Sequence, residues 1–395
     1  MRILALRPEG LVIPFIHASM VKAFRSLGLE VLDLSFPENE EDARALKSLA
    51  RCTPTAIFTV DLPLGMSAKK SMRDFQSFIG IPWIIWFVDD PDGYGFSESC
   101  DPSWTIVFCW DREIVGTACS GGSWKGIEPM YLPLATDPEV FFPEGGGFPV
   151  SFPGGVFVGS TAHSNPFLDG AIRNCSDFDE DISGLWKRWK KCLGKAPQAL
   201  AWGFLGEKTG IESGTLQQNP LARLWVQSAV HRLGQKKREE IVCRVIGEGG
   251  GVFGDRGWEQ PMGNLYLGEI TYGEALRRVY LGSAFILDIR QPQSRTGTTQ
   301  RVFDAGACGI PVLTDFSPEM ESLFDLDRET YFFRTLEEAQ EIKNLILLHP
   351  PAGREKGARA RERVLALHTY RHRAREVLHA LHRFFPCSLA YSSIP

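Results

Sequence analysis

The stretch SAFILDIRQPQSRTGTTQRVFDAGACGIPVLTD, residues Ser283 to Asp315, carries the pattern that decides the fold. Its apolar run Phe285–Ile289 is typical of a buried strand, and a polar loop follows it. Helical spacing begins near Gln300, and after a tight turn Pro311–Thr314 forms a second apolar run. A strand, a helix and a second strand in this order predict a parallel sheet whose strands are connected by helices.

The loop and first helical turn of this stretch carry groups that suit a phosphate. Either Thr298 or Thr299 is placed to cap the helix, whose backbone N–H groups and positive dipole end attract an anion. Arginines can add bidentate donors to a pyrophosphate, and an aspartate one turn later can accept from ribose hydroxyls. The alternative is a capped helix with solvated arginines. The candidate donor-binding residues are Arg290, Arg295, Gly297, Thr298, Thr299, Gln300, Arg301 and Asp304.

The rest of the second half continues this alternation of strands and helices. Gly155–Val158 and Ile241–Ile246 are further apolar or β-branched runs and predict two more strands. Helical spacing around Leu185–Cys192 and Leu221–Leu233 lies between them, so residues 176–240 are expected to be helices and loops of the same domain.

The first half of the chain has the same organisation. Polar segments with helical spacing, such as Ala18–Leu27 and Glu40–Leu49, lie between short apolar runs. These runs predict five strands, Arg2–Leu6, Glu30–Leu34, Ala56–Val60, Trp83–Val88 and Thr105–Cys109, with Met130–Pro133 leading out of the series.

The Pro- and Gly-rich stretch LPLATDPEVFFPEGGGFP separates the two series and predicts a domain boundary near residue 150. We expect an α/β fold with two Rossmann-like, doubly wound domains facing a cleft, because open α/β sheets bind ligands beyond the carboxyl ends of their strands. The first domain is expected to span residues 1–150 and the second residues 151–360. A C-terminal helix over 361–385 and a mobile tail over 386–395 complete the expectation.

Length and composition agree with two soluble domains. The chain has 395 residues, of which 44% are hydrophobic, and it includes 10 Trp and 26 Phe, enough for two cores. Its 43 Lys and Arg against 48 Asp and Glu give a formal net charge of −5, which offers no reason to expect a nucleic-acid partner.

The chain shows no apolar segment that suits a membrane span or a signal peptide. The longest apolar run, Phe78 to Val88, is interrupted by Gly80 and Pro82 and is too short to cross a bilayer. The nine Cys form no CxxC pair, so neither a disulfide framework nor a zinc site is indicated. We therefore expect a cytoplasmic protein with reduced thiols.

Motifs in a fixed order resemble the CgeB-like spore-maturation glycosyltransferases over residues 80 to 375. In the first half they are IPWIIWFVDDP (Ile81–Pro91), VFCWDRE (Val107–Glu113) and YLPLATDPEVF (Tyr131–Phe141). In the second half they are Phe157–Ser160, Gly257–Trp258, Tyr272–Tyr280, Phe285–Ile289, Arg301–Asp315 and His368–Arg373. This chain departs from the family at Asp304, where such enzymes commonly carry Glu.

The resemblance implies a GT-B fold with an acceptor-binding first domain and a second domain that holds a nucleotide diphosphate sugar. It also implies that the last helix crosses back to the first domain. In many GT-B enzymes a helix dipole and cationic side chains stabilise the leaving group, and this chain has no obvious DxD pair beside the donor strands. We therefore expect neither a metal ion nor a cofactor.

Two further segments are candidates for the donor site. Gly159 and Ser160 follow the predicted strand Gly155–Val158, and a glycine there lets the backbone approach a phosphate or sugar closely. Trp258, in a Gly-rich stretch, is either a stacking face for a nucleobase or a structural core residue.

Candidate catalytic bases lie in the first half. Asp89 and Asp90 follow the apolar strand Trp83–Val88, although Asp-Asp-Pro-Asp-Gly is also a strong turn sequence. His17, expected in the first strand-to-helix loop, is a second candidate because histidine titrates near neutrality. The histidines of HTYRHRAREVLHALHRFF have helical spacing around an apolar stripe, which favours packing over a metal site.

These features together predict a glycosyltransferase that moves a sugar from a nucleotide diphosphate to an unidentified acceptor, whether a glycan, a protein or a small molecule. The alternatives are a non-catalytic nucleotide-sugar-binding protein and a nucleotide-sugar epimerase or hydrolase on the same fold.

Overall fold

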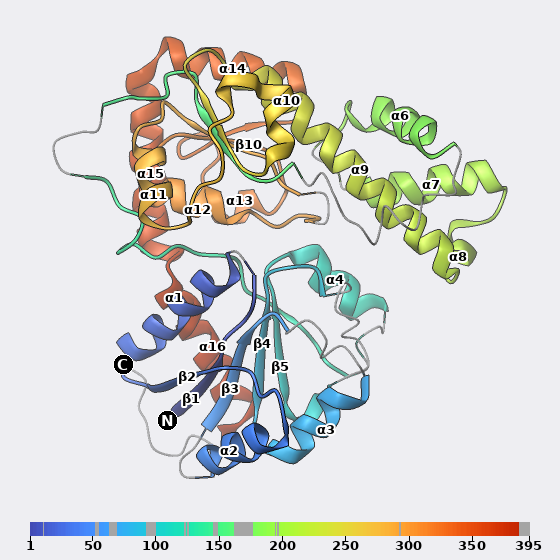
Figure 1. Cartoon of the computed structure of the whole chain (residues 1–395), viewed down its shortest axis with the longest axis vertical. Coiled ribbons are helices and arrows are strands. Elements are labelled where there is room, and N and C mark those ends of the chain that lie inside the picture. Colours follow the sequence, from blue (N-terminus) through green and yellow to red (C-terminus); the bar gives the residue numbers. More distant parts are fainter. Residues whose placement is uncertain are drawn as a thin grey trace. The chain divides into compact units, whose positions relative to one another are not determined.

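The computed structural model describes residues 1–10, 12–51, 55–62, 69–91, 100–121, 124, 126–144, 149–161, 177–193, 195, 197–291 and 294–386. The chain forms two compact units (Figure 1). The first unit consists of Met1–Asp137 and Ala366–Pro395, and the second of Pro138–Leu365.

The first unit is built on a parallel sheet with strand order β2-β1-β3-β4-β5-β6. The central strand β4 is fully buried, because its residues WIIWF are apolar on both faces of the sheet. Its strands are β1 (Arg2–Leu6), β2 (Glu30–Leu34), β3 (Thr55–Val60), β4 (Trp83–Phe87), β5 (Thr105–Cys109) and β6 (Met130–Tyr131).

Helices connect these strands, and one of them comes from the far end of the chain. Helix α16 packs against α1, and Arg373 on α16 donates to the carbonyl oxygens of Pro133 at 2.7 Å and Leu134 at 3.1 Å. The helices of this unit are α1 (Ile13–Ser26), α2 (Glu40–Ala50), α3 (Lys69–Ile79), the 3₁₀ helix η3 (Pro102–Trp104), α4 (Arg112–Gly121) and α16 (Tyr370–Phe384).

The second unit has a parallel sheet with strand order β11-β10-β9-β7-β8. A core of apolar side chains that includes Phe157, Leu287 and Leu313 covers this sheet. Its strands are β7 (Val156–Val158), β8 (Gly251–Phe253), β9 (Ile286–Asp288), β10 (Val312–Asp315) and β11 (Tyr331–Phe333).

Helices α6, α7 and α8 gather around the long helix α9, beside the sheet of the second unit (Figure 1). The helices of this unit are α6 (Phe178–Trp189), α7 (Pro197–Thr209), α8 (Ser213–Leu216), α9 (Pro220–Val245), η4 (Arg256–Trp258), α10 (Glu259–Met262), η5 (Gly263–Leu265), α11 (Glu274–Leu281), α12 (Gln300–Ala307), α13 (Met320–Leu323), α14 (Leu336–Leu348) and α15 (Pro350–Leu367).

One predicted strand is wrong. Residues Ile241–Ile246 form the end of α9 and its cap, although the run is rich in β-branched side chains. Ile241, Val242 and Val245 are fully buried on one face of this helix, and tertiary packing of that face outweighs β-propensity. The true strand is the short Gly251–Phe253, and the pattern also missed Tyr331–Phe333.

The observed boundaries differ from the expected ones. The first unit ends at Asp137 rather than near residue 150, and the second ends at Leu365 rather than 360. The expected C-terminal helix over 361–385 divides into the end of α15 and the separate helix α16, which Thr369 caps. Most of the tail predicted to be mobile, residues 387–395, lies outside the described residues.

Candidate functional site

The strand order of the second sheet reverses at β7, because β8 lies on one side of β7 and β9 lies on the other. Open α/β sheets bind ligands beyond the carboxyl ends of their strands at such a point. Gly159 and Ser160 follow β7, and the loop from Ile289 to Thr299 joins β9 to α12. Both predicted donor-binding segments therefore lie at this reversal of strand order.

Asp288, the last residue of β9, organises the site. It is fully buried, and its Oδ1 accepts from Thr299 Oγ1 and Arg301 Nε, each at 2.7 Å. Its Oδ2 accepts from Thr314 Oγ1 at 2.9 Å. The sequence analysis missed Asp288, although an acidic residue at the carboxyl end of an apolar strand was a usable signal.

The two threonines behave differently from the prediction. Thr299 occupies the N-cap position of α12 but makes no capping hydrogen bond, because its hydroxyl donates to Asp288. Thr298 is 3% exposed, and its buried hydroxyl has no hydrogen-bond partner among the described residues. The predicted threonine cap is wrong, and α12 begins without a capping side chain.

Arg301 lies beside the strand end at Gly159. Its Nη2 donates to the carbonyl oxygen of Ile289 at 3.1 Å, and its side chain is 19% exposed. A Cβ added at Gly159 would lie 3.4 Å from Arg301 Nη1 and 3.0 Å from Phe157 Cζ. The missing side chain of Gly159 therefore keeps the space beside the Arg301 guanidinium open.

Arg290 is held within the protein and is only 4% exposed. Its backbone N–H and Nε donate to Asp315, while its Nη atoms donate to the carbonyl oxygens of Arg295 at 3.1 Å and Phe316 at 2.7 Å. Lys237 Nζ also contacts Asp315, at 2.7 Å. Burial favours the neutral acid, but Lys237 and Arg290 outweigh it and hold the pKa of Asp315 below its usual range. These contacts give Arg290 the role of fixing the loop.

Arg238 of α9 is a buried cation without a carboxylate partner in the described part of the chain. It is 1% exposed, and it donates to the carbonyl oxygens of Ser160 at 2.7 Å and Ile289 at 3.4 Å. Its Nε has no hydrogen-bond partner within the described ranges. Burial, reinforced by the charge of Arg301, lowers the pKa of Arg238 to about 9, although the charges of Asp288, Asp315 and Asp255 oppose this shift. A buried guanidinium of this kind is costly unless an anion compensates it.

The sequence analysis missed both Lys237 and Arg238. They lie in the segment QKKREE of α9, which looks like a solvated helix surface. Only the packing of this helix against the sheet brings Arg238 to the carboxyl ends of β7 and β9 and Lys237 to the carboxyl end of β10.

Asp304 is almost fully buried, at 1% exposure. Its oxygens accept from Tyr272 Oη at 2.7 Å and Gln300 Nε2 at 3.0 Å. The side chain therefore braces Tyr272 against the first turn of α12. This geometry does not support the expected direct contact of Asp304 with ribose.

Trp258 belongs to the core, so its interpretation as a nucleobase-stacking face is wrong. It is fully buried, its ring packs edge-on against Phe157 at 5.4 Å, and its Nε1 donates to the carbonyl oxygen of Gly159 at 2.8 Å. This hydrogen bond holds the backbone of the turn at Gly159 in place. Gly297 is also buried, and its carbonyl oxygen accepts from Ser294 Oγ at 3.0 Å.

In the first unit, His17 is not the loop residue that the sequence predicted. It lies inside α1, is 3% exposed and contacts Asp33 Oδ1 through Nε2 at 3.0 Å. Burial lowers the pKa of His17, although Asp33 opposes this shift. A buried, paired imidazole of this kind fixes α1 to β2 and is a poor candidate for a catalytic base.

Three aspartates follow the neighbouring parallel strands β3 and β4 at their carboxyl ends. Asp89 is exposed and Asp90 half-buried directly after β4, as the sequence predicted for a strand end. Asp61 follows β3 and is 2% exposed. Its Oδ1 accepts from the N–H groups of Val88 at 2.9 Å and Asp89 at 3.3 Å.

Asp61 is unusual in its backbone and its ionisation, and the sequence analysis missed it. Its φ of 53° is the only positive φ of a non-glycine residue within the described part of the chain. Its Oδ2 is buried and has no partner in that part. Burial, with the nearby charge of Asp89, raises the pKa of Asp61 to about 8. Strained, ionisable groups of this kind gather at functional sites.

Two classes of site receive no support in the described ranges. The His, Cys, Asp and Glu side chains placed there include no group of three or more that could hold a metal ion. Among the helices described, none combines the length and apolar character that a membrane crossing requires.

Residues 223–379 match a family model described as Glycosyl transferase-like. No curated protein has a sequence that matches this chain. Among solved structures, an alpha-glucosyltransferase in complex with UDP is similar, with 12% identity, a TM-score of 0.56, and coverage of 96% of this chain and 99% of that one.

Two other solved structures are similar over nearly their whole length. A glycosyltransferase from Rickettsia africae ESF-5 has 8% identity and a TM-score of 0.53, covering 97% of this chain and 98% of that one. Sucrose-phosphate synthase from Thermosynechococcus elongatus has 13% identity and a TM-score of 0.50, covering 98% and 100%. The two parallel sheets and these likenesses show a GT-B fold, and the family match supports a glycosyltransferase.

Proposed function

We propose that this chain is a glycosyltransferase that moves a sugar from a nucleotide diphosphate donor, and that its second unit holds the donor. Arg238 is the observation that carries the proposal. Its buried guanidinium has no carboxylate partner among the described residues and lies at the turn after β7, where an open sheet binds ligands. Asp288 and Asp315 offset part of the positive charge that Arg238 and its cationic neighbours place here, and a diphosphate would offset the rest.

The donor site assigned here combines the residues at the reversal of strand order. Ser160 and Gly159 form the turn, and Arg301 and the uncapped first turn of α12 face it. The hydroxyl of Thr298 beside this turn is buried and has no hydrogen-bond partner in the described ranges. Arg295 and Gly297 belong to the connecting loop that Arg290 holds in place.

The proposed chemistry needs charge at the leaving group and a proton acceptor at the incoming hydroxyl. The acceptor oxygen bonds to the anomeric carbon while the bond from that carbon to the diphosphate breaks. Arg301, Arg238 and the positive end of α12 stabilise the departing diphosphate. In an inverting transfer, Asp89 or Asp90 takes the proton of the acceptor hydroxyl. Protein cations supply the charge, so the proposal requires no metal ion and no cofactor.

We further propose that the chain is a CgeB-like glycosyltransferase and that it acts in the cytoplasm. The ordered motifs from Ile81–Pro91 to His368–Arg373 support the subfamily. The donor is a nucleotide diphosphate sugar, and the acceptor is a glycan, a protein or a small molecule that the site chemistry does not identify.

The first test is thermal stabilisation of the purified chain by UDP, GDP, ADP and their sugar derivatives. UDP leads the panel because the similar alpha-glucosyltransferase is in complex with it. A ligand at 100 times its Kd raises the free energy of unfolding by about 2.7 kcal/mol. We expect at least one nucleotide diphosphate to stabilise the protein, and Arg238→Lys to reduce that effect.

The matched control is Arg244→Gln, one and a half turns further along α9, whose arginine pairs with Glu240 at the surface. It should leave nucleotide binding unchanged. If no nucleotide diphosphate stabilises the chain, or if the two variants lose binding equally, the donor site is not where we assign it. Product analysis with the stabilising donor then separates transfer from epimerisation and hydrolysis, since neither of these reactions needs an acceptor.

A further inference from the structure

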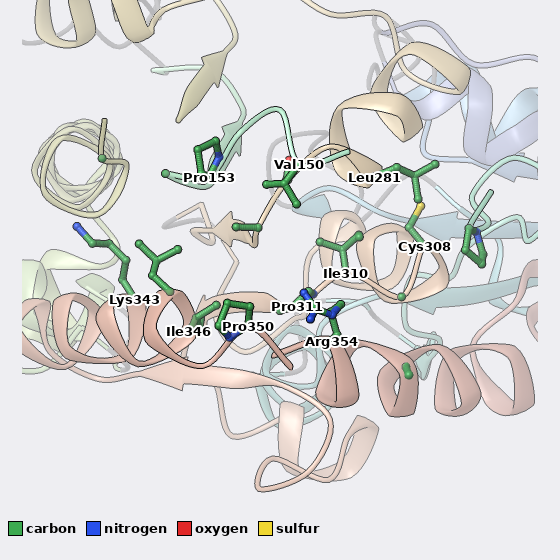
Figure 2. Close-up of a pocket in the computed structure, with 18 of the residues that line it drawn as sticks. Val150, Pro153, Leu281, Cys308, Ile310, Pro311, Lys343, Ile346, Pro350 and Arg354 are labelled. Carbon is green, nitrogen blue, oxygen red and sulfur yellow. The ribbon is translucent and has the colours of Figure 1, made fainter. Parts of the chain in front are cut away.

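A cavity with a volume of about 960 Å³ lies in the second unit (Figure 2). Its lining includes Gly154, Gly247, Ala284 and Pro311, each of which precedes one of the strands β7, β8, β9 and β10. The cavity is therefore at the amino edge of the sheet, whereas the proposed donor residues follow the strands at the carboxyl edge. It is not part of the site described above.

The cavity wall is mainly apolar. Leu281, Cys308 and Ile346 are buried beneath it, at 7%, 2% and 2% exposure. Val150 and Leu347 stand at its rim and remain 55% and 36% exposed. Contiguous exposed apolar surface around a hollow marks a ligand site, and the volume falls within the range of about 300–1,000 Å³ typical of small-molecule sites.

One side of the cavity carries cations from two helices. Figure 2 shows Lys343 of α14 and Arg354 of α15 on this helical side. Neither forms an ion pair or a hydrogen bond with another residue that the structure describes, and Lys343 Nζ lies 3.8 Å from the position of a Cβ at Gly247. Arg361 is different, because it donates to the carbonyl oxygen of Ala307.

The acidic residues of the wall do not neutralise these two cations. Glu144 pairs with Arg277 at 3.1 Å, so its charge is already compensated. Glu248, the other carboxylate in the lining, is exposed and forms no ion pair with Lys343 or Arg354. The cavity thus combines an apolar body with a cationic side, which is complementary to a molecule that has an apolar chain and one anionic end.

We propose that this cavity binds a small amphipathic anion, an alkyl chain with a carboxylate or phosphate head, whose head group contacts either Lys343 or Arg354, which Figure 2 shows apart from each other on the helical side. The apolar part lies against Leu281, Ile310 and Ile346. The site is separate from glycosyl transfer, so this proposal stands whether or not the proposed function holds.

The test is calorimetric binding of four probes below their micellar concentrations, namely decanoate, decyl phosphate, decanol and decyltrimethylammonium. We expect decanoate and decyl phosphate to bind, decanol to bind about five- to tenfold more weakly, and the cation not to bind. This ratio corresponds to about 1–1.4 kcal/mol. The two anionic probes distinguish a carboxylate from a phosphate head.

The variants locate the site. The double variant Lys343→Gln, Arg354→Gln should weaken decanoate binding to the level of decanol, and Leu347→Glu at the exposed rim should weaken it by repulsion. Arg359→Gln on α15 is the control, because Arg359 pairs with Glu355 and does not line the cavity. The proposal is overturned if no probe binds, if decanol or the cation binds as tightly as decanoate, or if the control and the double variant behave alike.

Discussion

Arg301 Nε lies 2.7 Å from Asp288 Oδ1, and this contact ties the first turn of α12 to the end of β9. The carboxylate is fully buried, while the side chain of Arg301 is 19% exposed. One side of the arginine is thus committed to the protein, and the other lies beside Gly159. The ion pair holds the Arg301 guanidinium beside the turn that follows β7, and part of the arginine side chain stays exposed to solvent.

We expect Asp288→Asn to destabilise the protein by about 3–5 kcal/mol, because it removes one partner of a buried ion pair and weakens three hydrogen bonds. Urea unfolding measures the change. The exposed pair between Arg359 and Glu355 is the comparison, and Glu355→Gln should cost about 0–0.5 kcal/mol. Equal losses in the two variants would show that burial of the Asp288 pair is energetically unimportant.

Arg301→Ala should weaken binding of the stabilising nucleotide diphosphate by about 1.5–3 kcal/mol, the usual contribution of a charge-assisted hydrogen bond. Calorimetry on the folded variant measures it, and Arg301→Lys should recover part of the loss as a point charge. An unchanged affinity in Arg301→Ala would refute the assignment of this residue to the donor.

Substitution of two different glycines by alanine should change the stability of the protein in opposite directions. A Cβ at Gly254 would collide with the carbonyl oxygen of Gly159, so Gly254→Ala should destabilise the protein and displace the turn of the proposed donor site. A Cβ at Gly203 within α7 meets nothing within 4 Å, so Gly203→Ala should stabilise by about 0.5–1 kcal/mol. Thermal unfolding of both variants checks the pair, and a stabilised Gly254→Ala would contradict the described turn.

Asp61 predicts a specific pH dependence of stability. Its pKa is about 8 in the folded chain against 3.8 in the unfolded one, so the folded state binds the extra proton between these values. The free energy of unfolding should therefore fall as pH rises from about 4 to about 8, by up to about 1.4 kcal/mol per pH unit from this group.

Urea unfolding between pH 5 and pH 8 measures this slope. Asp61→Asn should flatten it, because the amide does not titrate, while Asp74→Asn on the exposed surface of α3 should not change it. Parallel pH profiles for the wild-type chain and Asp61→Asn would mean that Asp61 ionises normally.

Once a donor is known, Asp89→Asn should lower the rate of transfer by about 10²–10⁴-fold, the usual contribution of a general base, without changing donor affinity. Asp90→Asn is the matched comparison, because only one of these two adjacent side chains is expected to act as the base. Full activity in both variants would remove these carboxylates from the mechanism.

The alternation of strands and helices was readable because parallel strands buried on both faces are nearly continuous apolar runs. WIIWF at 83–87 and the run within Phe285–Ile289 both form strands where the pattern predicted them. The prediction was wrong at Ile241–Ile246, where β-branched residues extend a helix whose buried face runs back to Val226. Local propensity could not reveal this, because the partner surface of α9 is distant in sequence.

The sequence by itself determined the α/β class. It also placed Gly159 and Ser160 after β7, the first turn of α12 after β9, and Asp89 and Asp90 after β4. Only the tertiary structure decided that the side chains of Trp258, Asp304 and His17 are buried and packed within the protein. It also decided which charged side chains lie at the carboxyl ends of the strands, namely Lys237, Arg238, Asp288 and Asp61. Strand ends follow from local apolar periodicity, whereas the burial and charge state of a side chain depend on elements that are far apart along the chain.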